Sequence, residues 1–107
     1  MINTMQSNLD ADYSNTVFYQ ISCKDPANQD VYVGYTTNLV RRKTAHKQGC
    51  NNPKSTHYNL KVHDYIRHYG GWDNWRVDII AFHECVNQED AIAKEKEYIV
   101  SHNATLN

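Results

Sequence analysis

Two side chains that could act on a phosphate group lie four residues apart in a basic segment. Arg42 and His46 share one face of the helix predicted there, because residues four apart in a helix are neighbours. A guanidinium suits phosphate because its planar fork donates two parallel hydrogen bonds. The same helix carries the further cations Arg41, Lys43 and Lys47. For Arg41 and Lys47 taken alone, a solvated basic face is the preferred interpretation.

A carboxylate stands out in the last predicted helix. Asn87 is expected to cap this helix, which ends near Ser101 and has an apolar stripe of Ala91, Ile92, Tyr98 and Ile99. Glu95 falls in the middle of that stripe. A lone carboxylate on a buried face is costly unless it is paired or binds a metal. An ion pair with Arg42 and a metal site are therefore equally favoured.

Two tyrosines occupy the strands that precede these helices. Tyr19 lies in a strand predicted for 16–22, and Tyr32 lies in a second strand at 30–35; a turn containing Asp-Pro joins them into an antiparallel hairpin. Gly34, near the end of the second strand, indicates a close backbone approach. Strand tyrosines more often serve packing than chemistry.

The remaining pattern completes a small α+β fold. Thr36, Thr37 and Asn38 offer caps for the basic helix, which is expected to run to Gln48 and stop at Gly49. A second helix is predicted over 57–69 and is ended by Gly70-Gly71. A third strand follows from Trp75 to about Phe82. The predicted order is ββααβα, with residues 1–15 as a flexible arm and 16–107 as one domain.

Charge distribution and cysteine content indicate the kind of partner and the cellular compartment. The chain has 107 residues and a formal net charge of −1, but residues 31–69 hold seven basic residues against one acidic residue, Asp64. That segment would attract a polyanion. An odd number of widely spaced cysteines predicts a reducing, intracellular compartment, and no apolar run could span a membrane. Cys50, His57 and His63 lack the spacing of a zinc site.

Taken together, these residues resemble the motif set of the GIY-YIG nucleases. Val17-Phe18-Tyr19, then twelve residues, then Tyr32-Val33-Gly34 is similar to the paired motif of that family. Arg42 and His46 follow Gly34 at the family's spacing, Glu95 begins Glu-Lys-Glu-Tyr-Ile, and Leu106-Asn107 resembles the closing motif. Only the tyrosine of the first triplet is kept. The resemblance covers residues 16–107.

The resemblance implies a three-stranded antiparallel sheet flanked by three helices, and hydrolysis of DNA phosphodiester bonds with one divalent metal, Mg²⁺ or Mn²⁺. In that reading Glu95 holds the metal, Arg42 holds the phosphate and Tyr19 activates water, with Tyr32 bonded nearby. His46 orients water or shuttles a proton, and Asn107 braces the site. The basic residues Arg41, Lys43 and Lys47 then contact DNA.

The sequence predicts a bare catalytic module, compatible with a virus- or phage-encoded enzyme. Its target would be chosen by its own loops, by the N-terminal arm, or by an accessory protein or targeting subunit. Two alternatives remain: a non-catalytic nucleic-acid-binding module that retains the fold, and a small structural protein in which Glu95 and Arg42 form a core salt bridge.

Overall fold

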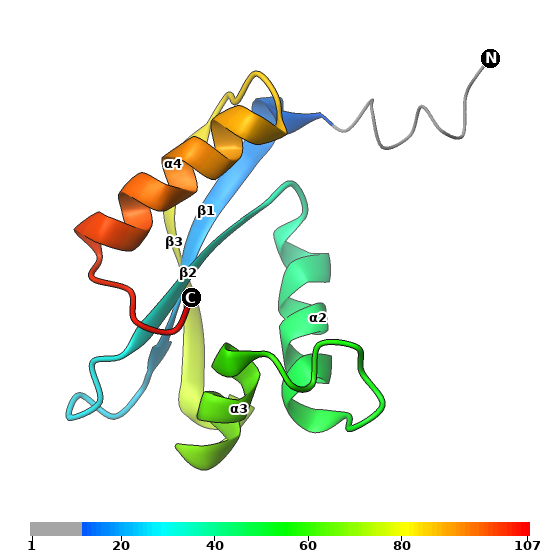
Figure 1. The fold of residues 1–107 in the computed structure, drawn as a ribbon, viewed down its shortest axis with the longest axis vertical. Helices are drawn as coiled ribbons and strands as arrows, with labels where there is room; N and C mark the ends of the chain where they lie inside the picture. The colour runs from blue at the N-terminus through cyan, green and yellow to red at the C-terminus, as the bar shows by residue number, and fades with distance from the viewer. Residues whose placement is uncertain (1–11) are drawn as a thin grey trace.

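The computed structural model describes residues 12–107 of the chain. At its centre is a three-stranded antiparallel sheet in the order β2-β1-β3, with helices around it (Figure 1). The predicted α+β class and the order ββααβα are confirmed. Along the chain the elements are η1 (Tyr13–Asn15), β1 (Thr16–Cys23), β2 (Val31–Thr36), α2 (Leu39–Asn51), α3 (Lys61–His68), η2 (Trp72–Asn74), β3 (Trp75–His83) and α4 (Gln88–Ser101).

The two faces of the sheet bury different side chains. Because side chains alternate along a strand, Tyr19 of β1 points to one face and Phe18 to the other. On the first face Tyr19 packs with residues of α2 and α3, and on the second Phe18 packs with residues of α4. Figure 1 shows α4 beside one end of the strands and α3 beside the other. Consecutive residues of the central strand β1 therefore pack against different helices on the two faces of the sheet.

The β1–β2 hairpin and the ends of the helices follow the predicted chemistry. Tyr19 lies opposite Gly34 in the hairpin register. Asn38 and Asn87 begin α2 and α4, because each side chain accepts a hydrogen bond from the backbone three residues later. Gly70 and Gly71 follow α3 with φ of +103° and +81°, a conformation that side chains other than glycine rarely adopt.

Helix α2 does not stop at Gly49, so that expectation is wrong. The helix continues to Asn51, and Asn52 caps it. Gly49 serves packing instead, because a Cβ at this position would overlap the imidazole of His63. The glycine allows α3 to bring a ring against the backbone of α2.

Helix α3 begins at Lys61 rather than at about residue 57. The preceding residues form tight turns, in which Tyr58 N–H donates to Ser55 O and Leu60 N–H donates to His57 O. The His57 carbonyl also accepts a 2.7 Å hydrogen bond from the ring of His63. These bonds compete with helical hydrogen bonding, and the helix starts after them.

The predicted N-terminal arm falls largely outside the described residues, which begin at Asp12. Within its last part, η1 is capped by Asp12, and Tyr13 packs against the cluster under α4. None of the helices in residues 12–107 combines the length and the apolar character needed to cross a bilayer.

Candidate active site

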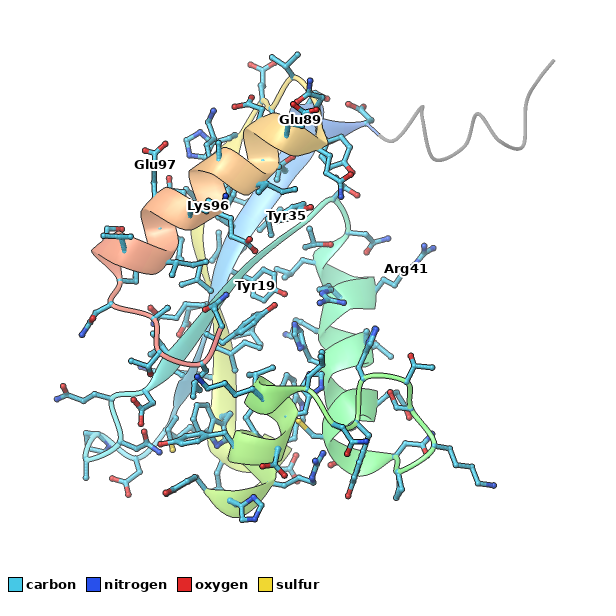
Figure 2. The ribbon with its side chains drawn as sticks, in the orientation of Figure 1. Tyr19, Tyr35, Arg41, Glu89, Lys96 and Glu97 are labelled. Carbon is cyan, nitrogen blue, oxygen red and sulfur yellow. The ribbon has the colours of Figure 1, made fainter. Side chains whose placement is uncertain are left out.

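Tyr19, His46 and Arg42 meet between β1 and α2. The Tyr19 hydroxyl lies 2.7 Å from Nε2 of His46, and Nε of Arg42 donates to the same oxygen at 3.4 Å. Arg42 and His46 are one helical turn apart on α2, as the sequence predicts. Figure 2 places Tyr19 between the strands and α2. The sequence motifs therefore converge on one phenolic oxygen.

Gly34 makes room for this arrangement. A Cβ at residue 34 would lie 2.5 Å from the Tyr19 hydroxyl oxygen and 3.0 Å from Cε2 of Tyr32. The close approach predicted for this glycine is confirmed, and the atoms that approach it belong to the two strand tyrosines. Tyr32 also packs edge-on against His46, with ring centroids 5.4 Å apart.

Burial keeps both partners of the Tyr19–His46 hydrogen bond neutral. Each side chain is only 1% exposed. Burial raises the pKa of Tyr19 well above its usual value, with a further rise from Tyr32, and Arg42 offsets only part of this. Burial lowers the pKa of His46 to about 3, helped by the charge of Arg42 and by His63. The cation Arg42 favours the ionised form of Tyr19, but desolvation outweighs it.

An open cleft of about 340 Å³ adjoins this cluster. Tyr32, Arg42 and Glu95 line it together with Tyr13, Tyr35, Thr36 and Thr37. The cleft joins β2, the start of α2 and α4, so it brings together residues more than fifty positions apart in the sequence. Tyr19 lies behind Arg42 rather than on the cleft wall.

Glu95 enters the cleft without a partner among residues 12–107. It is half-buried and makes neither a hydrogen bond nor an ion pair within this part of the chain. Burial raises the pKa of Glu95, and Arg42 opposes that rise. The salt bridge that the structural alternative required is not formed, because Arg42 directs its Nε to Tyr19 instead.

The donor set in the cleft fits a hard divalent cation. Glu95 brings one carboxylate to this cleft, which tyrosine and threonine residues also line, and Mg²⁺ prefers oxygen ligands while keeping much of its water. Within residues 12–107 no three His, Cys, Asp or Glu side chains are grouped as a metal cage.

Asn107 secures the free edge of β2. Its Oδ1 accepts from the backbone N–H of Val33 at 3.0 Å, and its Nδ2 donates to the Val33 carbonyl at 2.6 Å. An edge strand leaves such groups unpaired. Asn107 thus holds the backbone between Tyr32 and Gly34.

A comparison with known protein families identifies the family of this chain. The family described as the GIY-YIG catalytic domain matches residues 15–107. The chain belongs to the GIY-YIG family. It is a family of nucleases. Comparisons with curated proteins and with solved structures gave no significant match.

The departures of this GIY-YIG domain from its motif lie in packing positions. Phe18, where the motif has isoleucine, is fully buried under α4, and Val17 is partly buried. Neither side chain reaches the cleft. The substitutions in the first triplet therefore leave the tyrosine cluster unchanged.

The basic residues of α2 divide into two groups. Arg42 faces the cleft, whereas Arg41, Lys43 and Lys47 are exposed. Figure 2 shows Arg41 projecting from the side of α2 that is turned away from the sheet. These three cations lie on the same helix as the cleft arginine but outside the cleft.

His63 is the residue of this cluster that sequence reasoning missed. Its Nε2 lies 2.8 Å from Nδ1 of His46, and it is 1% exposed. A signal was available, because His63 follows Val62 directly and precedes Ile66 by three, which places it beside the apolar stripe of α3. Stripe position indicates burial, but it does not indicate which partner lies across the interface.

Proposed function

We propose that this GIY-YIG domain is a divalent-metal-dependent endonuclease that hydrolyses DNA phosphodiester bonds. The single observation that carries the proposal is the shared position of Arg42: it lines the cleft with Glu95 and donates to the Tyr19–His46 pair behind it. An anion-binding group, a carboxylate suited to a cation and a proton-accepting pair are thus combined at one point.

Glu95 and Arg42 would hold the reacting phosphate from two sides. Glu95 would anchor Mg²⁺, for which Mn²⁺ could substitute. When bound, the cation neutralises charge on the phosphate and on the leaving oxygen. Arg42 would bind the same phosphate and stabilise the charge that develops in the transition state. Its 3.4 Å hydrogen bond to Tyr19 is long, so exchanging it for charge-assisted bonds to phosphate costs little.

When Arg42 releases Tyr19 to bind phosphate, the Tyr19 hydroxyl would become accessible to the attacking water. Because the pKa of Tyr19 is raised, a stable tyrosinate is not the base. Tyr19 would instead take a proton from water as its own proton passes to Nε2 of His46, which is 2.7 Å away and neutral. Tyr32 would line the approach, and Asn107 would keep β2 in place.

The exposed cations of α2 would contact the DNA backbone outside the cleft. Arg41, Lys43 and Lys47 add sequence-independent affinity, which falls as salt increases. The functional unit we propose is residues 16–107, with target choice made by its loops, by the N-terminal arm or by a targeting protein. Its three unpaired cysteines agree with a reducing intracellular setting, including a virus- or phage-infected cell.

Incubation with supercoiled plasmid tests the proposal. With Mg²⁺ we expect nicked or linear DNA, and with EDTA we expect none. A shift in gel mobility without cleavage in any metal would indicate the non-catalytic binding module. If the protein neither binds nor cleaves the plasmid, the result would favour the small structural protein.

A further inference from the structure

A chain of buried hydrogen bonds continues from the active site into the interior. It runs from Tyr19 to His46 at 2.7 Å, from His46 to His63 at 2.8 Å, and from Nδ1 of His63 to the His57 carbonyl at 2.7 Å. It connects β1, α2 and α3. No member of it beyond His46 belongs to the motif set described above.

The two ends of this chain fix the direction of every hydrogen bond in it. The His57 carbonyl can only accept, so Nδ1 of His63 carries a hydrogen and its Nε2 must accept when the ring is neutral. Nδ1 of His46 is then the donor, and its Nε2 has a free lone pair. At the other end Arg42 can only donate, so the Tyr19 oxygen accepts there and its hydrogen points to His46.

The surroundings favour the neutral rings that this assignment needs. Both imidazoles are 1% exposed, and burial lowers the pKa of each. The charge of Arg42 and the imidazole of His57 oppose protonation of both rings, and Arg67 also opposes it at His63, whereas the hydrogen bond to the His57 carbonyl raises the pKa of His63 and offsets only part of the effect of burial.

Helix α2 and the loop that carries His57 both fix the position of His63. Gly49 leaves the space that its ring occupies. Arg67 donates to the Gly49 carbonyl at 3.0 Å and to the Tyr58 carbonyl at 2.7 Å, which ties α2 to the loop that carries His57. His63 is thus packed against Gly49 of α2 and hydrogen-bonded at both ring nitrogens.

We propose that His63 is a positioning residue for the proposed cleavage reaction, because it holds His46 in the tautomer whose Nε2 can accept the Tyr19 proton. The inference rests on the proposed function. It assigns His63 the role that an aspartate plays toward the histidine of a serine-protease triad, with a neutral imidazole in place of the carboxylate.

The proton steps balance along the chain. Water gives a proton to the Tyr19 oxygen, and the Tyr19 hydroxyl proton moves to Nε2 of His46. The hydrogen on Nδ1 of His46 stays bonded to Nε2 of His63, whose own Nδ1–H stays bonded to the His57 carbonyl. The positive charge rests on His46 until the sequence reverses, when the leaving oxygen takes up the proton.

The first test is the tautomer of His46, read from ring ¹⁵N shifts by NMR at pH 7 without DNA. The native protein should show hydrogen on Nδ1 for both His46 and His63. His63→Leu removes the acceptor. His46 should then carry its hydrogen on Nε2 and donate to Tyr19, because otherwise a buried N–H would lack a partner. An Nε2–H tautomer or a charged His46 ring in the native protein would overturn the proposal.

The second test is single-turnover plasmid cleavage by a matched set of variants. His63→Leu should lower the rate constant by roughly a hundredfold, the scale of acid–base assistance, while the DNA concentration for half-saturation stays unchanged. His63→Gln places an amide oxygen where Nε2 was, so it should keep the Nδ1–H tautomer of His46 and recover most of the rate.

His68→Gln is the control, since His68 lies on the same helix with its side chain 68% exposed, and it should cleave like the native protein. Equal rates for the Leu and Gln variants of His63, with His46 unchanged in both, would contradict the positioning role. If the native protein cleaves nothing, the proposed function fails, whereas the tautomer still confirms or contradicts the hydrogen-bond assignment.

Discussion

Two tyrosine–histidine hydrogen bonds of equal length lie on opposite faces of the sheet. Tyr19 and His46 are 2.7 Å apart on the face covered by α2 and α3, and Tyr98 and His83 are 2.7 Å apart on the face covered by α4. Both pairs join a helix to a strand. Phe18, next to Tyr19 in β1, packs against the second pair, with ring centroids 5.2 Å from Tyr98.

The pairs differ in what surrounds them. Tyr19 and His46 are buried and extended at both ends, by Arg42 and by His63. The Tyr98–His83 bond is only partly buried, and within residues 12–107 no further side-chain hydrogen bond extends it. Residue types and distance are the same, so it is burial and the donor or acceptor at each end that give the first pair a fixed direction of proton transfer.

The largest effect is expected from Glu95→Gln. This change keeps the shape of the side chain but removes the charge that would anchor Mg²⁺, so plasmid cleavage should be abolished. In EDTA the melting temperature should be equal or higher, because an unpaired half-buried carboxylate is lost. Glu97→Gln, on the exposed side of the same helix, should change neither result (Figure 2). A clearly lower melting temperature for Glu95→Gln would indicate a structural ion pair.

A smaller but still large loss is expected from Arg42→Lys. Lysine keeps the charge but lacks the fork that binds phosphate and reaches Tyr19, so cleavage should fall by roughly a hundredfold or more. DNA binding, measured by fluorescence anisotropy, should change little. Arg41→Lys on the outer side of α2 is the control. Equal cleavage by the two variants would make Arg42 an ordinary surface cation.

The smallest change per measurement step concerns stability in acid. His46 is held neutral with a pKa of about 3, so below pH 6.5 the unfolded state binds more protons than the folded state. The free energy of unfolding should therefore fall from pH 6.5 toward pH 3, by about 1.4 kcal/mol per pH unit for this residue. Urea unfolding at several pH values should show a shallower slope for His46→Gln, and an unchanged slope would mean that the ring is not buried neutral.

Arg42, His46 and Gly34 could be placed from the sequence because their spacing is local, whereas the role expected for Glu95 came from the family resemblance. Arg42 and His46 had to share a helix face, and Gly34 had to admit a neighbouring atom. In the structure Tyr19 contacts both Arg42 and His46, and Tyr32 and Glu95 line the same cleft.

His63 and the extent of α2 could not be placed in the same way. Gly49 was interpreted as a helix stop because glycine usually ends helices, but here it admits the His63 ring. The His46–His63 bond joins two helices across an interface. Helical periodicity shows which side of a helix is buried, whereas the choice of partner depends on how the helices pack.

The most direct measurement compares Tyr19→Phe with Tyr98→Phe in single-turnover cleavage of supercoiled plasmid with Mg²⁺. Each variant loses one hydroxyl and one 2.7 Å hydrogen bond to a histidine. We expect Tyr19→Phe to cleave roughly a hundredfold more slowly or worse, and Tyr98→Phe to cleave like the native protein. Native rates for Tyr19→Phe, or equal losses for the two variants, would contradict the claim that the buried pair carries the chemistry.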